Sequence, residues 1–215
     1  EFLTGMTFKK SLAVLALALA AAVAPLQATT RATDYPGSVS ILLDLPAVRS
    51  DLGLSSKQKS QLKTIRKELA AKTKAILQKT KSPQSSVLTT DQRLFGMIDL
   101  NNAEALAVLV PDQLNRFHEI QNRMLGYTMV FSPRVQKKLG LSQSQVRKIE
   151  KIRILGLEFV AQANRSFEEG TMNHDKRLEV LRAYRIDQSA EIKKILTPAQ
   201  TESFAKLCGK PVKGS

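Results

Sequence analysis

One five-residue pattern occurs four times in this chain at regular spacing. It reads Leu, then usually Ser or Thr, then two variable residues, then Gln, and its copies begin at Leu54, Leu109, Leu141 and Leu196. The first and third copies lie 87 residues apart (141 − 54), and so do the second and fourth (196 − 109). A fixed internal period is the sign of a repeated structural unit. We therefore divide the chain into repeat 1 (39–126) and repeat 2 (127–208).

The two repeats align without a gap over 46–120 and 133–207, and sixteen aligned positions are identical. The motif itself predicts a helix start, because Ser or Thr at the N-cap accepts from the third helical amide while Gln reaches back to the N-cap amide. Proline follows the N-cap in two copies, at the first helical position, where its missing N–H does no harm. The second copy has Val110 in place of the hydroxyl residue. The residues to which we assign this structural capping role are Leu54, Ser55, Gln58, Leu109, Gln113, Leu141, Ser142, Gln145, Leu196, Thr197 and Gln200.

The pattern predicts an all-α fold made of two tandem copies of a short helix followed by three helices, arranged as extended helical hairpins. In repeat 1 we expect long helices over 56–80, 91–108 and 111–125, with Thr90 capping the second. In repeat 2 we expect a helix after Ser142, a turn at 168–173, a helix capped by Asn173, and a helix over 198–207. The only run with β-strand character is 127–131.

We expect residues 1–28 to be an upstream extension, 1–5, followed by a cleaved secretory signal peptide that begins at Met6. Lys9 and Lys10 form a basic start, 11–24 is apolar and too short to cross a membrane, and Ala28 offers a cleavage site. A retained N-terminal anchor is the alternative. We expect 29–38 to be a disordered linker, 209–215 to be a basic tail, and the mature protein to be in the periplasm.

The mature chain is strongly basic. Without Glu1, Lys9 and Lys10 it has 31 Lys and Arg and 18 Asp and Glu, and 31 minus 18 gives a net charge of +13. Such a charge favours nucleic acid or another anionic partner. Export argues against nucleic acid, so acidic proteins, anionic lipid through peripheral membrane contact, and polyanionic envelope material remain as partners.

The basic residues concentrate in the first long helix of repeat 1. Nine of them lie between Ser55 and Lys81, with Glu68 as the only acid, whereas the matching helix of repeat 2 is nearly balanced. This helix either is a solvated surface or binds acidic or unfolded proteins. The residues that we predict to bind such clients are Lys57, Lys59, Lys63, Arg66, Lys67 and Lys74.

The sequence gives little support to enzyme chemistry. Its two histidines, His118 and His174, occupy non-equivalent positions in the repeats, and no Gly-rich phosphate loop or paired-cysteine metal pattern occurs. We therefore expect no catalytic residues, no metal and no cofactor. Cys208 is the only cysteine, so no disulfide can form within one chain, and its position in the last helix indicates burial.

The four motifs, the signal peptide and the helical pattern resemble the LTXXQ-motif family of periplasmic proteins, the Spy/CpxP group. The copy from Leu196 to Gln200 matches the family signature fully, the copies at Leu54 and Leu141 have Ser for Thr, and the copy at Leu109 matches only at Leu and Gln. Two motifs per chain are usual in the family, and two chains pair into a curved cradle whose basic, partly apolar concave face holds unfolded clients without ATP.

The resemblance implies a covalently fused pseudo-dimer in which each repeat corresponds to one protomer, present as a monomer or a weak homodimer. It also implies an ATP-independent holdase, with shallow apolar patches on the same surface as the basic helix. The alternative is a non-catalytic regulator or adaptor of envelope stress, possibly responsive to metal, that binds one acidic partner such as an envelope sensor protein. The spacing of 55 residues between the motifs of one repeat is short for the family and implies shorter arms.

Overall fold

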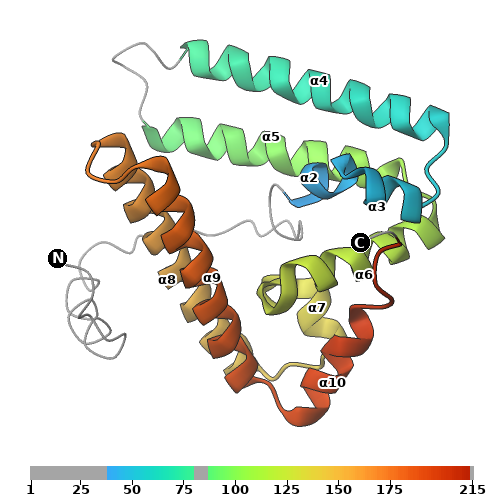
Figure 1. Cartoon of the computed structure of the whole chain (residues 1–215), viewed down its shortest axis with the longest axis vertical. Coiled ribbons are helices and arrows are strands. Elements are labelled where there is room, and N and C mark those ends of the chain that lie inside the picture. The colour runs from blue at the N-terminus through green and yellow to red at the C-terminus, as the bar shows by residue number, and fades with distance from the viewer. Residues whose placement is uncertain (1–37, 80–86, 214–215) are drawn as a thin grey trace. The chain divides into compact units, whose positions relative to one another are not determined.

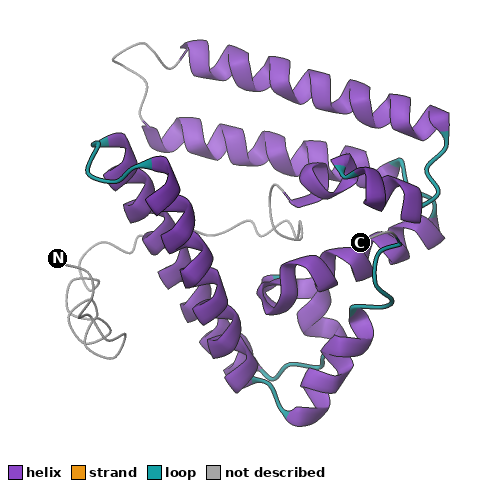
Figure 2. Cartoon of the chain, in the orientation of Figure 1, coloured by secondary structure: helices purple, strands orange, loops and turns teal. Residues whose placement is uncertain are grey.

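The computed structural model describes residues 38–79 and 87–213, with side chains except at Ser38 and at 76–96. Every regular element in these ranges is helical, which confirms the all-α class (Figure 2). None of the described helices is long and apolar enough to cross a membrane. The predicted signal peptide and nearly all of the predicted linker lie outside the described residues.

The elements of the two repeats correspond one to one along the chain (Figure 1). Repeat 1 comprises α2 (Ser38–Asp44), α3 (Pro46–Asp51), α4 (Ser56–Lys79), α5 (Val87–Ala107) and α6 (Pro111–Leu125). Repeat 2 comprises the 3-10 helix η2 (Gly126–Phe131), α7 (Pro133–Lys138), α8 (Gln143–Glu168), α9 (His174–Ile195) and α10 (Pro198–Leu207). Four helices of repeat 1, α3 to α6, start 87 residues before their counterparts in repeat 2. Helix α2 starts 88 residues before η2.

Each long hairpin is an antiparallel pair, α4 with α5 and α8 with α9. The turn of the second hairpin is as predicted: the side chain of Asn173 accepts from Lys176 N at 2.8 Å. Gly53 and Gly140 end α3 and α7 with positive φ angles of 61° and 58°, as expected of glycine after a helix.

One local prediction is wrong, at the start of α5. The run 127–131, which has weak β character in the sequence, forms the 3-10 helix η2 in agreement with the all-α prediction, and Met129 and Val130 are buried in it. Helix α5 begins at Val87, so Thr90 lies inside it and is not its N-cap. The sequence offers a second capping residue type at Ser86, directly before Val87, and pattern alone could not choose between the two.

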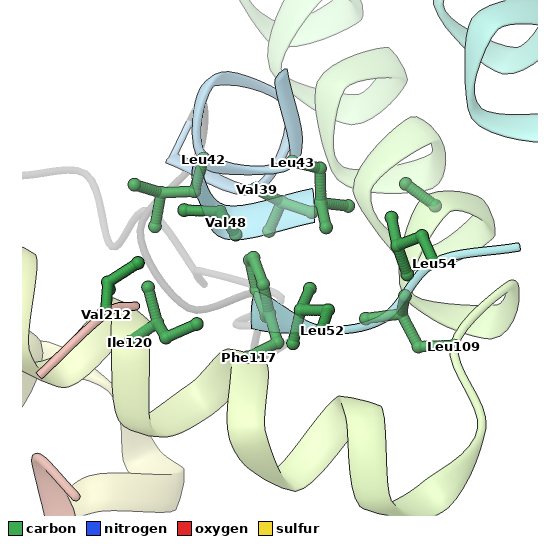
Figure 3. Packing of buried hydrophobic residues seen from close by; sticks show 11 residues of the cluster. Val39, Leu42, Leu43, Val48, Leu52, Leu54, Leu109, Phe117, Ile120 and Val212 are labelled. Carbon is green, nitrogen blue, oxygen red and sulfur yellow. The ribbon is translucent and has the colours of Figure 1, made fainter. Parts of the chain in front are cut away.

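Each repeat has its own hydrophobic cluster. In repeat 1 it joins α2 and α3 to α5 and α6, with Phe117 and Ile120 fully buried (Figure 3). In repeat 2 the cluster joins η2 and α7 to α8, α9 and α10, around Met129, Ile149 and Phe204. Phe117 and Phe204 are the matched aromatic residues of the two clusters.

The residues after α10 are packed against repeat 1. Val212 is buried in the cluster of repeat 1, where Figure 3 places it near Ile120 and Leu42. Arg116 donates to the carbonyl oxygens of Lys210 and Pro211, each at 3.0 Å. The part of the predicted basic tail that is described, 209–213, therefore ties the end of repeat 2 to α6.

Candidate functional site

The motif residues form the capping boxes that the sequence predicts. At the start of α8, Gln145 N donates to Ser142 Oγ at 3.2 Å, and Ser142 N donates to Gln145 Oε1 at 3.0 Å. The same pair of bonds occurs at the motifs of α4 and α10. At α6 only half of the box forms, from Val110 N to Gln113 Oε1, because valine has no side-chain acceptor.

Each motif glutamine also contacts the other motif of its own repeat. In repeat 1, Gln58 Nε2 donates to Gln113 Oε1 at 2.6 Å and to Val108 O at 2.9 Å. In repeat 2, Gln145 Nε2 donates to Gln200 Oε1 at 2.7 Å and to Ile195 O at 2.9 Å. These amide pairs fasten the open end of each hairpin, and the sequence analysis missed them. The equal spacing of 55 residues between the glutamines of each pair is the signal that could have revealed them.

A second polar link crosses each hairpin at equivalent positions. Asn101 Nδ2 donates to Ile65 O at 2.9 Å, and Gln188 Nε2 donates to Ile152 O at 3.4 Å. Because the hydrogen-bonding groups of these amides are used within the fold, the motifs position the hairpins and are poor candidates for ligand binding. The exposed sides of the hairpins are the remaining candidates.

Helix α4 presents its lysines to solvent. Lys59, Lys63, Lys67 and Lys74 follow one another at spacings of four, four and seven, which places them along one stripe of the helix. We call these four residues the lysine stripe. All four are exposed, as is Lys57, which lies off the stripe. None of these lysines forms an ion pair with a residue that the structure describes.

Arg66 differs from the other predicted client-binding residues because it has a partner. Its guanidinium forms an ion pair with Asp44 of α2, and Arg49 donates to the same carboxyl group at 2.7 Å. Arg66 therefore helps to join α4 to α2, and the unpaired charge of α4 belongs to its lysines.

The described part of α4 exposes no large apolar side chain beside its lysines. The large apolar side chains of α4 that are described, Leu62, Ile65 and Leu69, are partly buried in the hairpin. On the second hairpin, exposed large apolar side chains include Ile154, Leu157, Val160 and Phe167 on α8, and Leu178 and Ile186 on α9, while Ile41, Leu100, Val110 and Met124 are exposed in repeat 1. Helix α8 thus exposes a group of large apolar side chains that the described part of α4 does not have.

One charged cluster is structural. The carboxyl group of Asp51, 3% exposed, accepts from Arg116 at 2.6 Å, and Arg116 also contacts Glu119 at 2.8 Å. Burial lowers the pKa of Arg116, but its hydrogen bonds to Glu119 and Asp51 raise the pKa above the ordinary value overall. Arg116 is therefore a fixed charge that holds α3, α6 and the residues after α10 together.

The titratable groups near the end of α10 do not form a reactive site. Burial raises the pKa of the Cys208 thiol, and Arg123 opposes that shift only partly. Burial likewise raises the pKa of Tyr127, whose ring stacks on Phe204 at 4.8 Å between centroids. Within 38–79 and 87–213 no group of three or more His, Cys, Asp or Glu side chains could hold a metal ion.

A scan against protein-family models and searches of curated proteins and of solved structures find no match for this chain.

Proposed function

We propose that this protein is a periplasmic, ATP-independent holdase of the Spy/CpxP kind, which binds unfolded or acidic proteins through the lysine stripe of α4. The observation that carries this proposal is that the four lysines of the stripe are exposed, aligned and without ion pairs among the described residues. A continuous row of one charge, free of internal partners, is suited to capture an oppositely charged chain.

The energetics of the stripe support an external partner. Like charges four residues apart destabilise a helix by about 0.2–0.5 kcal/mol per pair, and Lys59, Lys63 and Lys67 form two such pairs. A bound acidic chain would remove this repulsion. Since the lysines are exposed, the attraction is screened by salt and acts mainly on the rate of association.

The fused pseudo-dimer is part of this proposal. It is supported by the matched contacts of the two repeats, in which the Gln58–Gln113 and Gln145–Gln200 pairs occupy equivalent positions. Light scattering of the purified protein should then give the mass of a single chain. An obligate dimer of two chains would contradict the fusion.

The test is aggregation of two unrelated unfolding proteins, followed by light scattering without ATP, with the chain from Thr29 added at near-equal concentration. We expect suppression of both, weakened by added salt. Replacing the lysine stripe with glutamine, as K59Q/K63Q/K67Q/K74Q, should abolish most of this activity.

The control removes four exposed positive charges from repeat 2, as K137Q/K148Q/K151Q/R165Q, and should leave the activity close to normal. Equal loss in both variants would show that net charge, and not the stripe, is responsible. Suppression of neither client by the unchanged protein would reject the holdase. A single saturable acidic partner would then favour the adaptor that the sequence also suggests.

A further inference from the structure

The second hairpin has an uncovered apolar surface that the fold does not use. On α8, Leu157, Val160 and Phe167 are 57%, 39% and 38% exposed, and Leu178 of α9 is 40% exposed. The α8 residues follow one another at spacings of three and seven, so they lie along one side of the helix. Large apolar side chains exposed together along one side of a helix are a candidate interaction surface, whereas singly scattered ones are common on any protein.

Repeat 1 shows that the hairpin does not need these residues. The positions that match Leu157, Val160 and Phe167 are Ala70, Thr73 and Thr80. Ala70 is exposed and Thr73 partly buried on a helix that pairs with its neighbour as α8 does. The large side chains of α8 therefore add apolar surface beyond what pairing with α9 requires.

Two arginines of α9 border this surface. Phe159 stacks on Tyr184 at 4.2 Å between centroids, and this contact sets the register of the antiparallel helices. In that register the numbers of facing residues add to 343, so Leu157 is level with Ile186 and Val160 with Ala183. Arg185 and Arg182 are therefore each one residue away from these levels along α9. Leu178, Arg182 and Arg185 recur at spacings of four and three, so they share one side of α9. Both arginines are exposed and form no ion pair within the described ranges.

The contacts at the two ends of this surface place it on a single side of the hairpin. Near the base of the hairpin, a Cβ atom placed on Gly126 would lie 4.0 Å from Ser189 Oγ, so the start of η2 covers the side of α9 on which Ser189 lies. Arg182 and Arg185 lie on the same side of α9, closer to the turn. Near the turn, Arg177 of α9 lies 4.6 Å from the ring centroid of Phe167. The uncovered surface thus extends a face that η2 already packs against.

We propose that Leu157, Val160, Phe167, Leu178, Arg182 and Arg185, the apolar–arginine strip, bind a short extended segment of an unfolded polypeptide that carries both apolar and acidic side chains. This proposal rests on the proposed function and divides its work between the repeats. The lysine stripe of repeat 1 captures acidic chains, and the strip of repeat 2 holds their apolar residues.

The dimensions and charges of the strip fit such a segment. Leu157 to Phe167 spans ten residues of helix, about 15 Å. An extended chain covers that length with about five residues, whose side chains alternate between its two sides. Arginine beside apolar surface suits a carboxylate next to an apolar side chain, because the guanidinium both pairs with the carboxylate and packs against apolar groups.

Charge argues against two other occupants. A second copy of this chain, with a net charge of +14, would bring its own positive charge to the two arginines. An anionic membrane would meet Glu168 and Glu169 at the end of α8 beside Phe167, both exposed. These carboxylates disfavour insertion of that end among anionic headgroups, and they place the acidic side chains of a bound segment at Arg182 and Arg185, away from Phe167.

The test measures binding of a fluorescent synthetic peptide of about a dozen residues, alternating Leu with Asp, by anisotropy. The strip variant L157A/V160T/F167T carries the residues of repeat 1 at all three positions. Its affinity should fall about tenfold or more, as expected when apolar anchors are truncated. The variant R182Q/R185Q should lower the affinity for this peptide. It should leave unchanged the affinity for a peptide that has Asn in place of Asp.

A matched control, I41A/L100A/M124A, removes three other exposed apolar side chains, 65%, 59% and 49% exposed, and should bind normally. If the strip variant binds the peptide as tightly as the unchanged protein does, the proposal is overturned. It is also overturned if the strip variant loses binding only to vesicles of anionic phospholipid and not to the peptide. Circular dichroism of the strip variant should show unchanged helix content.

The aggregation assay separates failure of the strip from failure of the holdase. If the strip variant suppresses aggregation as well as the unchanged protein does, the strip is rejected and the holdase stands. If the unchanged protein suppresses no aggregation but its peptide affinity depends on the strip, the holdase is rejected and the binding surface stands.

Discussion

The two hairpins have the same internal contacts and different surfaces. Gln58 and Gln145 make the same four side-chain bonds to equivalent partners, and Asn101 and Gln188 make the same cross-hairpin link. Outside, three matched positions are Lys67, Ala70 and Thr73 in α4 but Ile154, Leu157 and Val160 in α8. Contacts inside a repeat thus restrict its residues, while its exposed side can take a separate role.

The pairing extends to contacts made by different residue types. Arg49 Nε donates to Leu43 O in repeat 1, and Gln136 Nε2 donates to Val130 O at the equivalent position in repeat 2. This position requires a long side chain that ends in a hydrogen-bond donor, and a charged or a neutral donor serves equally. Sequence identity therefore underestimates how closely the two repeats agree.

The largest expected effect comes from the matched core aromatic residues. F117A and F204A should each lower the free energy of unfolding by about 3–5 kcal/mol, because each leaves a large cavity in its own cluster. We expect F117A to cost more, since Phe117 is fully buried in the cluster that also contains Val212. Urea denaturation of both variants measures the difference. Similar unfolding of F204A and the unchanged protein would contradict the equivalence of the two clusters.

The next effect is specific to repeat 1. R116S introduces the residue that repeat 2 has at the matched position, Ser203, and should cost about 3 kcal/mol because it leaves the Asp51 carboxylate buried without its partner. Adding D51N should recover part of that loss. The measurement is again urea denaturation, and a loss under about 0.5 kcal/mol would show that the Asp51–Arg116 pair does not hold the chain end in place.

The motif glutamines should give smaller and equal effects. Q58A and Q145A each remove a reciprocal cap and the bond to the partner motif, which together are worth about 1–2 kcal/mol. Thermal unfolding of both variants tests this value. A large difference between them would break the equivalence of the repeats at the point where their sequences agree most closely.

The smallest effect concerns pH. Burial raises the pKa of Cys208, so the folded state favours the neutral thiol, and this contribution is complete below the thiol pKa of the unfolded chain. It is lost as pH rises through the higher pKa of the folded state. Alkylation near pH 8 should therefore be slower in the folded protein than in urea. Equal alkylation rates in the folded protein and in urea would contradict the raised pKa of Cys208. The variant C208Q introduces the residue of repeat 1, Gln121, and should remove this pH dependence of stability.

Local sequence signals predicted most helix boundaries because they depend on neighbouring residues. The starts of α4, α6 and α10 follow from N-cap residues and prolines, and the ends of α3 and α7 from Gly53 and Gly140. The start of α5 was wrong because two capping residue types precede it. The 3-10 helix at η2 could not be predicted from its own residues, because burial of Met129 and Val130 depends on helices distant in sequence.

Among the predicted client-binding residues, too, local features could be predicted from the sequence and contacts between distant segments could not. Exposure of Lys57, Lys59, Lys63, Lys67 and Lys74 follows from helix periodicity alone. The ion pair of Arg66 with Asp44 does not, because it needs α2 beside α4. The exposed apolar side chains of α8 and α9 do not follow from periodicity either, since a helix pattern does not show which flank a neighbouring helix leaves uncovered.

By itself the sequence determined that the chain is a duplicated all-helical protein with one strongly basic helix, because repeats, caps and charge are encoded in short stretches of residues. Only the tertiary structure decided that the motif glutamines pair across each hairpin, that Val212 completes the core of repeat 1, and that repeat 2 exposes an apolar strip. Each of these depends on segments far apart in the chain, whose contacts arise only when the helices pack.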